Sequence, residues 1–174
     1  VLKADIKSRK VQDESGHGQK ELIKDIQVEI QEGTLVALLG GAGAGKSTVM
    51  NCLDGFEYSG MDGVVELYGV DFIKNYARMK HLVGVIEQSN RFHPNAVVEN
   101  ELQHAAVHRL PKDTTKEEIK ERVDYTLKQL GIDNVRKNKI CKCSGGEQKR
   151  VNIGIELVAD RSFLFMDEPD AGLD

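Results

Sequence analysis

Apolar residues occur in short runs in the first and last parts of the chain and at helical spacing in the middle. A short apolar run bounded by glycines or turn residues is typical of a strand that is buried on both faces. Residues 1–33 are interpreted as strands and turns, with a polar hairpin tip at residues 13–19. Four later runs predict strands at residues 34–40, 63–69, 81–88 and 163–167.

Helical patterns lie between and after these runs. Residues 97–110 have a helical composition that stops at Pro111, and residues 147–159 form another amphipathic pattern. A mostly helical insert, residues 90–143, therefore separates two strand-rich parts. No internal repeat or low-complexity segment is present.

The helix predicted within residues 114–131 has recognisable signals at both ends. Thr115 is followed three residues later by Glu118, which is the spacing of a capping box. Gly131 is a natural C-terminal stop. The apolar positions of one helix face are Ile119, Val123, Leu127 and Leu130.

The stretch "GGAGAGKST" lies between the predicted strand at residues 34–40 and a helical pattern that begins near Lys46. From Gly40 to Ser47 it has the spacing G-x-x-x-x-G-K-S, which is the phosphate-loop pattern. Small side chains let backbone N–H groups close around phosphate oxygens, and the following helix points its positive end at the same anion. Lys46 adds a charge near the β and γ phosphates, and the hydroxyl of Ser47 is offered to Mg²⁺. The predicted nucleotide-binding residues are Gly40, Gly41, Ala42, Gly43, Ala44, Gly45, Lys46, Ser47 and Thr48.

Two acidic residues follow the last predicted strand directly. Asp167 is expected at the end of the strand, where it would hold the Mg²⁺ shell, and Glu168 would polarise the attacking water. A solvated acidic turn is the weaker interpretation, because four large apolar residues lead straight into these acids.

The stretch "CSGGEQKR" opens a helix with Ser144, Gly145 and Gly146. An exposed helix N-terminus of this kind attracts anions. Taken by itself, a plain serine N-cap beside a flexible glycine pair is the better interpretation.

Taken together, these motifs resemble the nucleotide-binding domain of ATP-binding cassette (ABC) proteins. "SGGE" is similar to the family's signature motif, although Cys143 stands where leucine is usual, and "AGLD" is similar to its D-loop. Gln88 follows a predicted strand at the place of the Q-loop. The resemblance covers essentially the whole chain. Within the family, residues 93–111, 116–131 and 143–174 resemble the G subfamily and its fungal pleiotropic drug resistance relatives.

The resemblance implies an α/β fold: a P-loop NTPase core with a mainly parallel sheet, an N-terminal antiparallel β part and a helical subdomain. One ABC ATPase domain would span residues 1–174. Its strand-rich part with the phosphate loop would end at residue 89. The helical insert would follow over residues 90–143, and the signature helix, the Walker B strand and the D-loop would occupy residues 144–174.

The resemblance also implies roles for individual residues. Lys46, Gln88 and Glu168 would be catalytic, with Glu168 as the general base. Gln88 would also join Ser47 and Asp167 around Mg²⁺. Asp174 would couple the two sites of a head-to-tail dimer. The signature residues that would reach the partner's γ-phosphate are Ser144, Gly145, Gly146 and Glu147.

Three features depart from the family pattern. No aromatic residue precedes Phe56, so the usual adenine stack is missing. His17 or an apolar contact is the alternative adenine contact, although His17 is expected to be a solvated hairpin residue. Asp170 replaces the usual serine or threonine. The family's switch histidine lies beyond the D-loop, so the chain is expected to be C-terminally truncated and slow at hydrolysis. His104 and His108 belong to the helical insert and do not fill that role.

Composition narrows the function further. The net charge of −4 and a pI near 5.8 argue against a broad nucleic-acid surface. No stretch approaches the roughly 18 apolar residues of a membrane span. The sparse cysteines Cys52, Cys141 and Cys143 fit a reducing compartment, and "CKC" is not expected to bind metal, since no further ligands complete a site.

The leading hypothesis is therefore an Mg²⁺-ATP-driven ATPase domain at the cytoplasmic face of a membrane. Its partners would be a second nucleotide-binding domain and a transporter's transmembrane domain, with no nucleic acid expected. A soluble ABC ATPase of DNA repair or translation is the alternative. A non-hydrolysing nucleotide sensor is a third reading, against which the intact Lys46, Asp167 and Glu168 argue.

Overall fold

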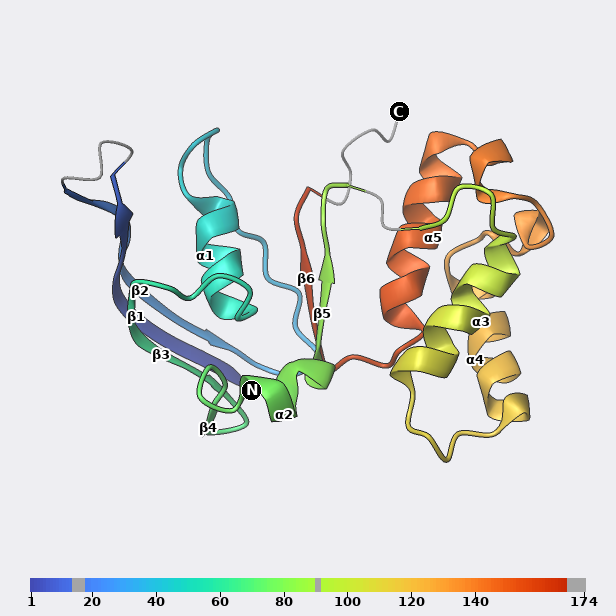
Figure 1. Ribbon diagram of the computed structural model, residues 1–174, viewed down its shortest axis with the longest axis horizontal. Helices are drawn as coiled ribbons and strands as arrows, with labels where there is room; N and C mark the ends of the chain where they lie inside the picture. Colours follow the sequence, from blue (N-terminus) through green and yellow to red (C-terminus); the bar gives the residue numbers. More distant parts are fainter. Residues whose placement is uncertain (14–17, 90–91, 169–174) are drawn as a thin grey trace. The chain divides into compact units, whose positions relative to one another are not determined.

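The computed structural model describes residues 1–13, 18–89 and 92–168, and it divides into two compact units, Val1–Lys80 and His81–Asp174 (Figure 1). The first unit contains a four-stranded antiparallel sheet with the strand order β2-β1-β3-β4. Its strands are β1 (Leu2–Gln12), β2 (Gln19–Ile30), β3 (Met61–Leu67) and β4 (Val70–Asp71).

The pattern of β1 explains why the sheet has one covered face. Leu2, Ala4 and Ile6 are buried, while the residues between them are exposed, as the two-residue period of a strand requires. β1 pairs with β2 from Leu2 opposite Ile30 to Gln12 opposite Gln19. The hairpin predicted at residues 13–19 is confirmed by this pairing, although residues 14–17, His17 among them, lie outside the described part.

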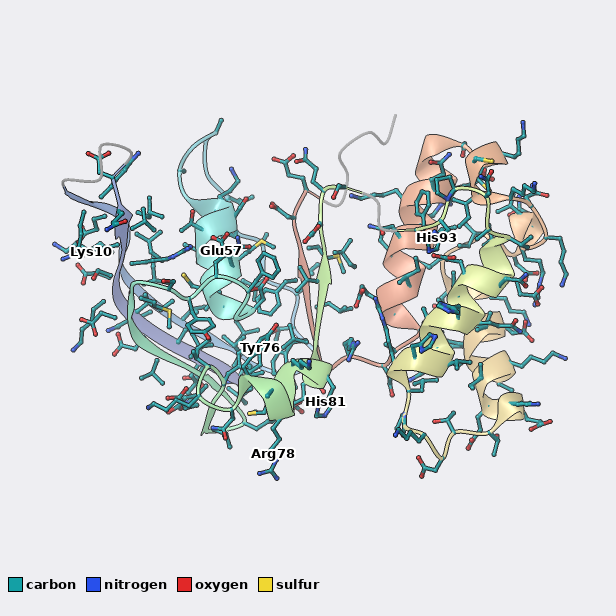
Figure 2. All side chains as sticks on the ribbon, viewed as in Figure 1. Lys10, Glu57, Tyr76, Arg78, His81 and His93 are labelled. Atoms are coloured by element: carbon teal, nitrogen blue, oxygen red, sulfur yellow. The ribbon has the colours of Figure 1, made fainter. Side chains whose placement is uncertain are left out.

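Helix α1 (Lys46–Leu53) packs against β2 and β3 and buries Val49, Cys52 and Leu53. Phe72 is fully buried, and its ring lies 5.4 Å from that of Tyr76, the first residue of the short helix α2 (Tyr76–Met79). Figure 2 labels Tyr76. The first unit therefore has its own apolar core, and α1 is anchored to it just behind the glycine loop.

Glu57 lies in the loop between α1 and β3 and anchors that loop to the sheet (Figure 2). The guanidinium of Arg9, which is buried on β1, donates to the carboxylate of Glu57 at 3.0 Å. A buried charge needs such a partner, so this ion pair fixes the chain that leaves α1.

The strand predicted at residues 34–40 is wrong for this structure, because that segment forms neither strand nor helix. Leu35 is 96% exposed and Leu39 is 88% exposed. An apolar run favours burial, but a strand exists only where neighbouring backbone supplies a hydrogen-bond ladder, and no described strand pairs with this segment.

The second unit combines a two-stranded parallel sheet with a helical group. Strands β5 (Val83–Ile86) and β6 (Phe163–Met166) pair in register, from Val83 opposite Phe163 to Ile86 opposite Met166. Both strands were predicted, but the side chains of β6 are half-buried, not buried on both faces.

Helices α3 (Val98–Arg109), α4 (Lys116–Gln129) and α5 (Gly145–Leu157) build the second unit's core, together with the 3₁₀ turns Asp133–Val135 and Ile140–Lys142. The predicted capping box of α4 is confirmed: Thr115 Oγ1 accepts from the backbone of Glu118, whose carboxylate accepts from the backbone of Thr115. Gly131 takes the left-handed conformation expected of a helix stop. The shared core residues of the three helices include Val98, Leu102, Val123, Leu127, Val151, Ile155 and Val158.

The expected α/β class with an antiparallel N-terminal part, a parallel sheet and a helical part is confirmed. Helix α5 packs with α3 and α4 in the second unit. No helix in the described ranges is long and apolar enough to cross a membrane.

Candidate functional site

The glycine loop wraps directly into the N-terminus of α1. Gly45 is the N-cap of that helix with φ +88°, and Gly43 has φ +75°. Both conformations strongly favour glycine. A turn in which the Ala44 N–H donates to the Gly41 carbonyl at 3.2 Å closes the loop. The loop therefore leads into a helix N-terminus, as a phosphate loop requires, but the segment before it is not the strand that was predicted.

The loop leaves open space where an anion would lie. A Cβ atom placed on Gly41 or Gly43 would meet nothing within 4 Å. The backbone there is bare, and the first N–H groups of α1 have no partners within the helix. Residues 40–47 therefore leave room for a phosphate group beside a helix N-terminus, and phosphate binding by these residues stays a prediction.

The ammonium group of Lys46 lies folded over this loop. Its Nζ donates to the carbonyl oxygens of Gly40 and Gly41, both at 3.0 Å. An ammonium group has three donors, so one N–H remains for a further acceptor. The positive charge is thus held at the loop itself.

In the second unit, the parallel register of β5 and β6 determines which side chains meet. Ile86 and Met166 are partners at the carboxyl ends of the two strands, and the Asp167 N–H continues the pairing to the Ile86 carbonyl at 3.0 Å. The next residues, Gln88 and Glu168, are therefore brought together.

Gln88 and Glu168 make a direct hydrogen bond. The Gln88 amide nitrogen donates to a Glu168 carboxylate oxygen at 2.9 Å. Glu168 has φ +45°, an uncommon value for a residue with a side chain, and such values cluster at functional sites. With its NH₂ group turned to Glu168, Gln88 keeps its amide oxygen as an acceptor or metal ligand.

The predicted signature residues gather at the N-terminus of α5. Ser144 is the N-cap, and its hydroxyl accepts from the Glu147 N–H at 3.3 Å. The Glu147 carboxylate accepts from the Ser144 backbone at 2.8 Å and from its hydroxyl at 3.0 Å. The hydrogen bond from the Ser144 backbone N–H has the larger effect and the bond from the Ser144 hydroxyl the smaller, and together they hold the pKa of the Glu147 carboxyl below its usual range. Gly145 and Gly146 add no side chains to this exposed end.

This arrangement refines the prediction for the signature helix. Ser144 forms the plain N-cap that was expected of the residue by itself, within a complete capping box. The Glu147 carboxylate already occupies the serine's donors, so an incoming anion would have to displace or share it. Contact between residues 144–147 and the γ-phosphate bound by a second nucleotide-binding domain stays a prediction.

Lys149 is a functional candidate that sequence reasoning missed. It is only 4% exposed, and its Nζ donates to the Glu87 carbonyl at 3.4 Å and the Gln88 carbonyl at 3.3 Å. The sequence shows only a lysine within an amphipathic helix; the structure places Lys149 on the buried face of α5 together with Asn152. A lysine at a core-facing position of an amphipathic helix rarely lacks a partner.

Hard oxygen ligands suited to Mg²⁺ are present among the predicted metal residues: the Ser47 hydroxyl, the Gln88 amide oxygen and the Asp167 carboxylate. Ser47 belongs to the first unit, and the other two belong to the second. Their common Mg²⁺ shell therefore stays a prediction, while the chemistry of each donor fits. Asp170 and Asp174 lie outside the described residues.

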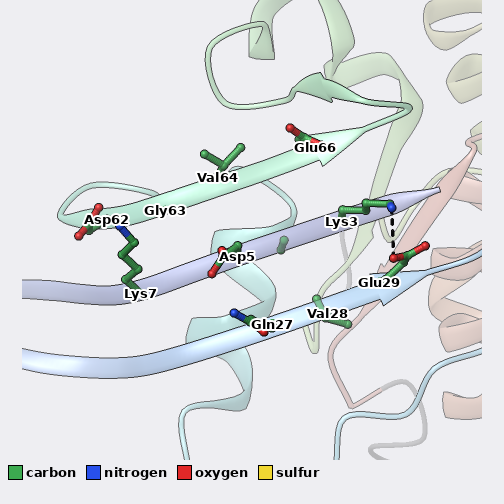
Figure 3. A pocket seen from close by; sticks show the side chains of 11 residues that line it. Lys3, Asp5, Lys7, Gln27, Val28, Glu29, Asp62, Gly63, Val64 and Glu66 are labelled. Carbon is green, nitrogen blue, oxygen red and sulfur yellow. Dashed lines mark ion pairs between the residues drawn. The ribbon is translucent and has the colours of Figure 1, made fainter.

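A shallow, open concavity lies on the other face of the antiparallel sheet (Figure 3). Alternating charged side chains line it, and Lys3 pairs with Glu29 at 3.2 Å across neighbouring strands. None of the phosphate-loop residues contributes to it. This surface is therefore the solvated side of the sheet and is separate from the phosphate loop.

A glycine loop capping a helix, and a glutamine paired with a glutamate beyond adjacent parallel strands, define a P-loop nucleotide-binding domain. The family model described as "ABC transporter" matches residues 23–171. The chain therefore belongs to the ABC transporter family. ABC domains are ATPases that bind ATP, so the predicted family and class are confirmed.

Individual relatives agree with this assignment. The ABC transporter ATP-binding/permease protein Rv1747 of Mycobacterium tuberculosis is 34% identical over 90% of this chain and 18% of its own length. ABC transporter G family member 1 of Arabidopsis thaliana is 37% identical over 89% of this chain and 22% of its own. The chain thus spans about a fifth of the length of these curated relatives, and the likeness to the G subfamily is supported.

Solved structures show the same fold. The cbiO1 protein of Clostridium perfringens, part of the ABC transporter complex cbiONQ, superposes with a TM-score of 0.83 at 28% identity, covering all of this chain and 67% of that one. The bacterial ABC transporter cassette MJ0796, solved as a dimer, also superposes with a TM-score of 0.83. Its sequence is 20% identical, and the match covers all of this chain and 76% of that one. The second likeness concerns the fold alone.

Proposed function

We propose that the chain binds and hydrolyses Mg²⁺-ATP and that this reaction powers substrate translocation by a membrane ABC transporter. The observation that carries the proposal is the hydrogen bond between Gln88 and Glu168. A carboxylate held in place at the carboxyl end of a parallel strand is positioned to act as a general base. The presence of Lys46, Asp167 and Glu168 together argues against a domain that only senses nucleotide.

In the proposed reaction, residues 40–48 cradle the triphosphate and Lys46 neutralises its charge. Mg²⁺ would be held by Ser47, Gln88 and Asp167, and it would supply charge neutralisation of the phosphate oxygens. Glu168 takes the proton of the attacking water. Gln88 orients that carboxylate through its 2.9 Å hydrogen bond.

The proposed partners are a second nucleotide-binding domain and the transporter's transmembrane domain, at the cytoplasmic face of the membrane. Ser144 and the glycines after it form an exposed helix N-terminus, which suits a trans contact with a γ-phosphate. Asp174 is assigned the coupling of the two sites. The relatives are named as transporters, which supports this role over a soluble ATPase of DNA repair or translation.

Phosphate release by the intact protein tests the proposal, with Glu168→Gln compared against the parent. Glutamine keeps the shape of glutamate but cannot accept the proton. We expect ATP binding to survive, turnover to fall roughly 10²- to 10⁴-fold, and ATP to hold two copies together in gel filtration. Turnover of the variant near the parent rate would exclude Glu168 as the base. A variant that stays monomeric at saturating ATP would exclude the head-to-tail dimer.

A further inference from the structure

Two histidines face each other on α3, a helix that supplies none of the nucleotide-site residues. His104 and His108 lie one turn apart, and both are exposed. Their Nε2 atoms are 3.1 Å apart, and the ring centroids are separated by 4.4 Å at an interplanar angle of 68°. The contact is a hydrogen bond in which one Nε2–H donates to the other Nε2, so a metal ion bound by both nitrogens would replace this bond, and the donor ring would then carry its proton on Nδ1.

That separation equals the bite of a chelated metal ion. Imidazole nitrogens bind Zn²⁺ at about 2.0–2.1 Å, which places two of them about 2.9 Å apart at a right angle and about 3.4 Å apart at the tetrahedral angle. The observed 3.1 Å falls between these limits. Residues four apart on a helix lie on the same face, so the backbone itself holds this spacing.

We propose that His104 and His108 form a binding site for a divalent transition metal on the exposed face of α3. Zn²⁺, Ni²⁺ and Cu²⁺ suit imidazole ligands, whereas Mg²⁺ and Ca²⁺ prefer oxygen. No three His, Cys, Asp or Glu side chains gather in the described ranges to hold a metal. The site is therefore a two-nitrogen chelate completed by water, and its ion exchanges with solvent.

Binding at this pair also acts on the helix. The two imidazoles meet only while α3 is helical between them, so the ion stabilises the C-terminal half of the helix. Arg109 follows immediately and donates to the Ile155 carbonyl of α5 at 2.9 Å. The metal site thus adjoins the point where α3 is tied to α5. The inference is independent of the proposed nucleotide chemistry.

Zn²⁺ titration of the intact protein by calorimetry tests the site, with His104→Ala, His108→Ala and the double variant compared with the parent. The matched control is His81→Ala, which removes an exposed histidine elsewhere in the second unit. The second imidazole of a chelate binds at a high effective concentration, so either single variant is expected to lose on the order of 10²-fold in affinity. His81→Ala is expected to bind as the parent does, and millimolar Mg²⁺ is expected not to compete.

Thermal unfolding supplies a second readout that does not depend on calorimetry. Zn²⁺ is expected to raise the midpoint of the parent and of His81→Ala, and to leave the double variant unshifted. Zn²⁺ affinity that stays at the parent value in both single variants would overturn the proposal. If each single variant bound half as many Zn²⁺ ions as the parent at an unchanged dissociation constant, the two imidazoles would bind independently, and this would also overturn the proposal. Displacement of Zn²⁺ by millimolar Mg²⁺ would overturn it as well.

Discussion

The side-chain amide of Gln88 donates to the carboxylate of Glu168 at 2.9 Å, although the two residues are 80 positions apart in the chain. The parallel register of β5 and β6 creates the contact, because both residues follow paired strand ends. The bond orients the carboxylate that we assign as general base. Replacing Gln88 is therefore expected to affect turnover more than nucleotide binding.

Gln88→Ala should lower kcat by roughly 10²-fold, since a carboxylate misplaced by about 1 Å loses on that order of rate. Affinity for ATP in the absence of Mg²⁺ should change little, because the phosphate loop is untouched and the Mg²⁺ ligand that is lost plays no part there. Steady-state phosphate release and nucleotide titration on the same preparation measure the two effects. Gln103→Ala, on α3, is the control. An equal loss of binding and turnover in Gln88→Ala would contradict a role in orienting Glu168.

Lys46→Ala should abolish most of the ATP binding. The ammonium group is held over the loop by the carbonyls of Gly40 and Gly41, where it would meet the phosphates. Ligand at about 100 times Kd raises stability by roughly 2.7 kcal/mol, so the parent's melting temperature should rise with Mg²⁺-ATP and the variant's should not. A parent whose melt is unmoved by millimolar Mg²⁺-ATP would contradict a functional nucleotide site.

The protein should discriminate weakly between ATP and GTP. Residues 1–55 contain no aromatic side chain to stack on the base, and such a stack contributes on the order of 1–3 kcal/mol. The phosphate loop reads the triphosphate, which the two nucleotides share. Parallel titrations measure the ratio. A preference for ATP of about a hundredfold or more would mean that another residue contacts adenine.

Lys149→Met should lower turnover while leaving nucleotide affinity near the parent value. The buried ammonium group donates to the carbonyls of Glu87 and Gln88, so it fixes the backbone that carries the Gln88 side chain. The loss is expected to be on the order of 10- to 10²-fold in kcat. Lys149→Arg keeps the charge and donors and should restore part of it, and Lys142→Met, at an exposed lysine, is the control.

A merely structural role for Lys149 would appear differently. Lys149→Met would then lower the melting temperature without changing kcat in the folded fraction, and Lys149→Arg would give no rescue. Comparing kcat and KM at a temperature where all variants are folded separates these outcomes.

Glu99→Gln should destabilise the helical part and make its free energy of unfolding depend less on pH in the acidic range. Hydrogen bonds from Lys137, which has the larger effect, and from Arg136 hold the pKa of the buried Glu99 carboxyl below its usual range. A depressed folded pKa means that this stability is present above the ordinary glutamate pKa and is lost as pH falls through the folded value. The variant should lose about 1–3 kcal/mol near neutral pH.

Denaturant unfolding of parent and Glu99→Gln between neutral and acidic pH measures the effect. The two curves should converge as the carboxyl of the parent becomes protonated. Arg136 also bonds to Asp124 at 2.6 Å and to Asp133 at 2.9 Å, so part of the network remains in the variant. A constant difference at every pH would show that Glu99 acts through packing and not through its charge.

Local chemistry is what the sequence by itself determined. The phosphate-loop spacing of Gly40 to Ser47, the capping box of Thr115 and Glu118, and the stop at Gly131 all depend on residues within a few positions of one another. Backbone conformation and short-range hydrogen bonds decide such features, so the pattern alone predicts them. The helices α3, α4 and α5 and the strands β3, β5 and β6 were predictable from local patterns as well.

Only the tertiary structure decided which distant groups meet. The apolar run at residues 34–40 predicted a strand, but strands need partners and no described strand pairs with it. The contact of Gln88 with Glu168 depends on the register of β5 and β6, and the burial of Lys149 depends on how α5 packs beside residues 87–88. A linear pattern shows which residues are apolar or charged. Only the fold shows which atoms come close enough to bond.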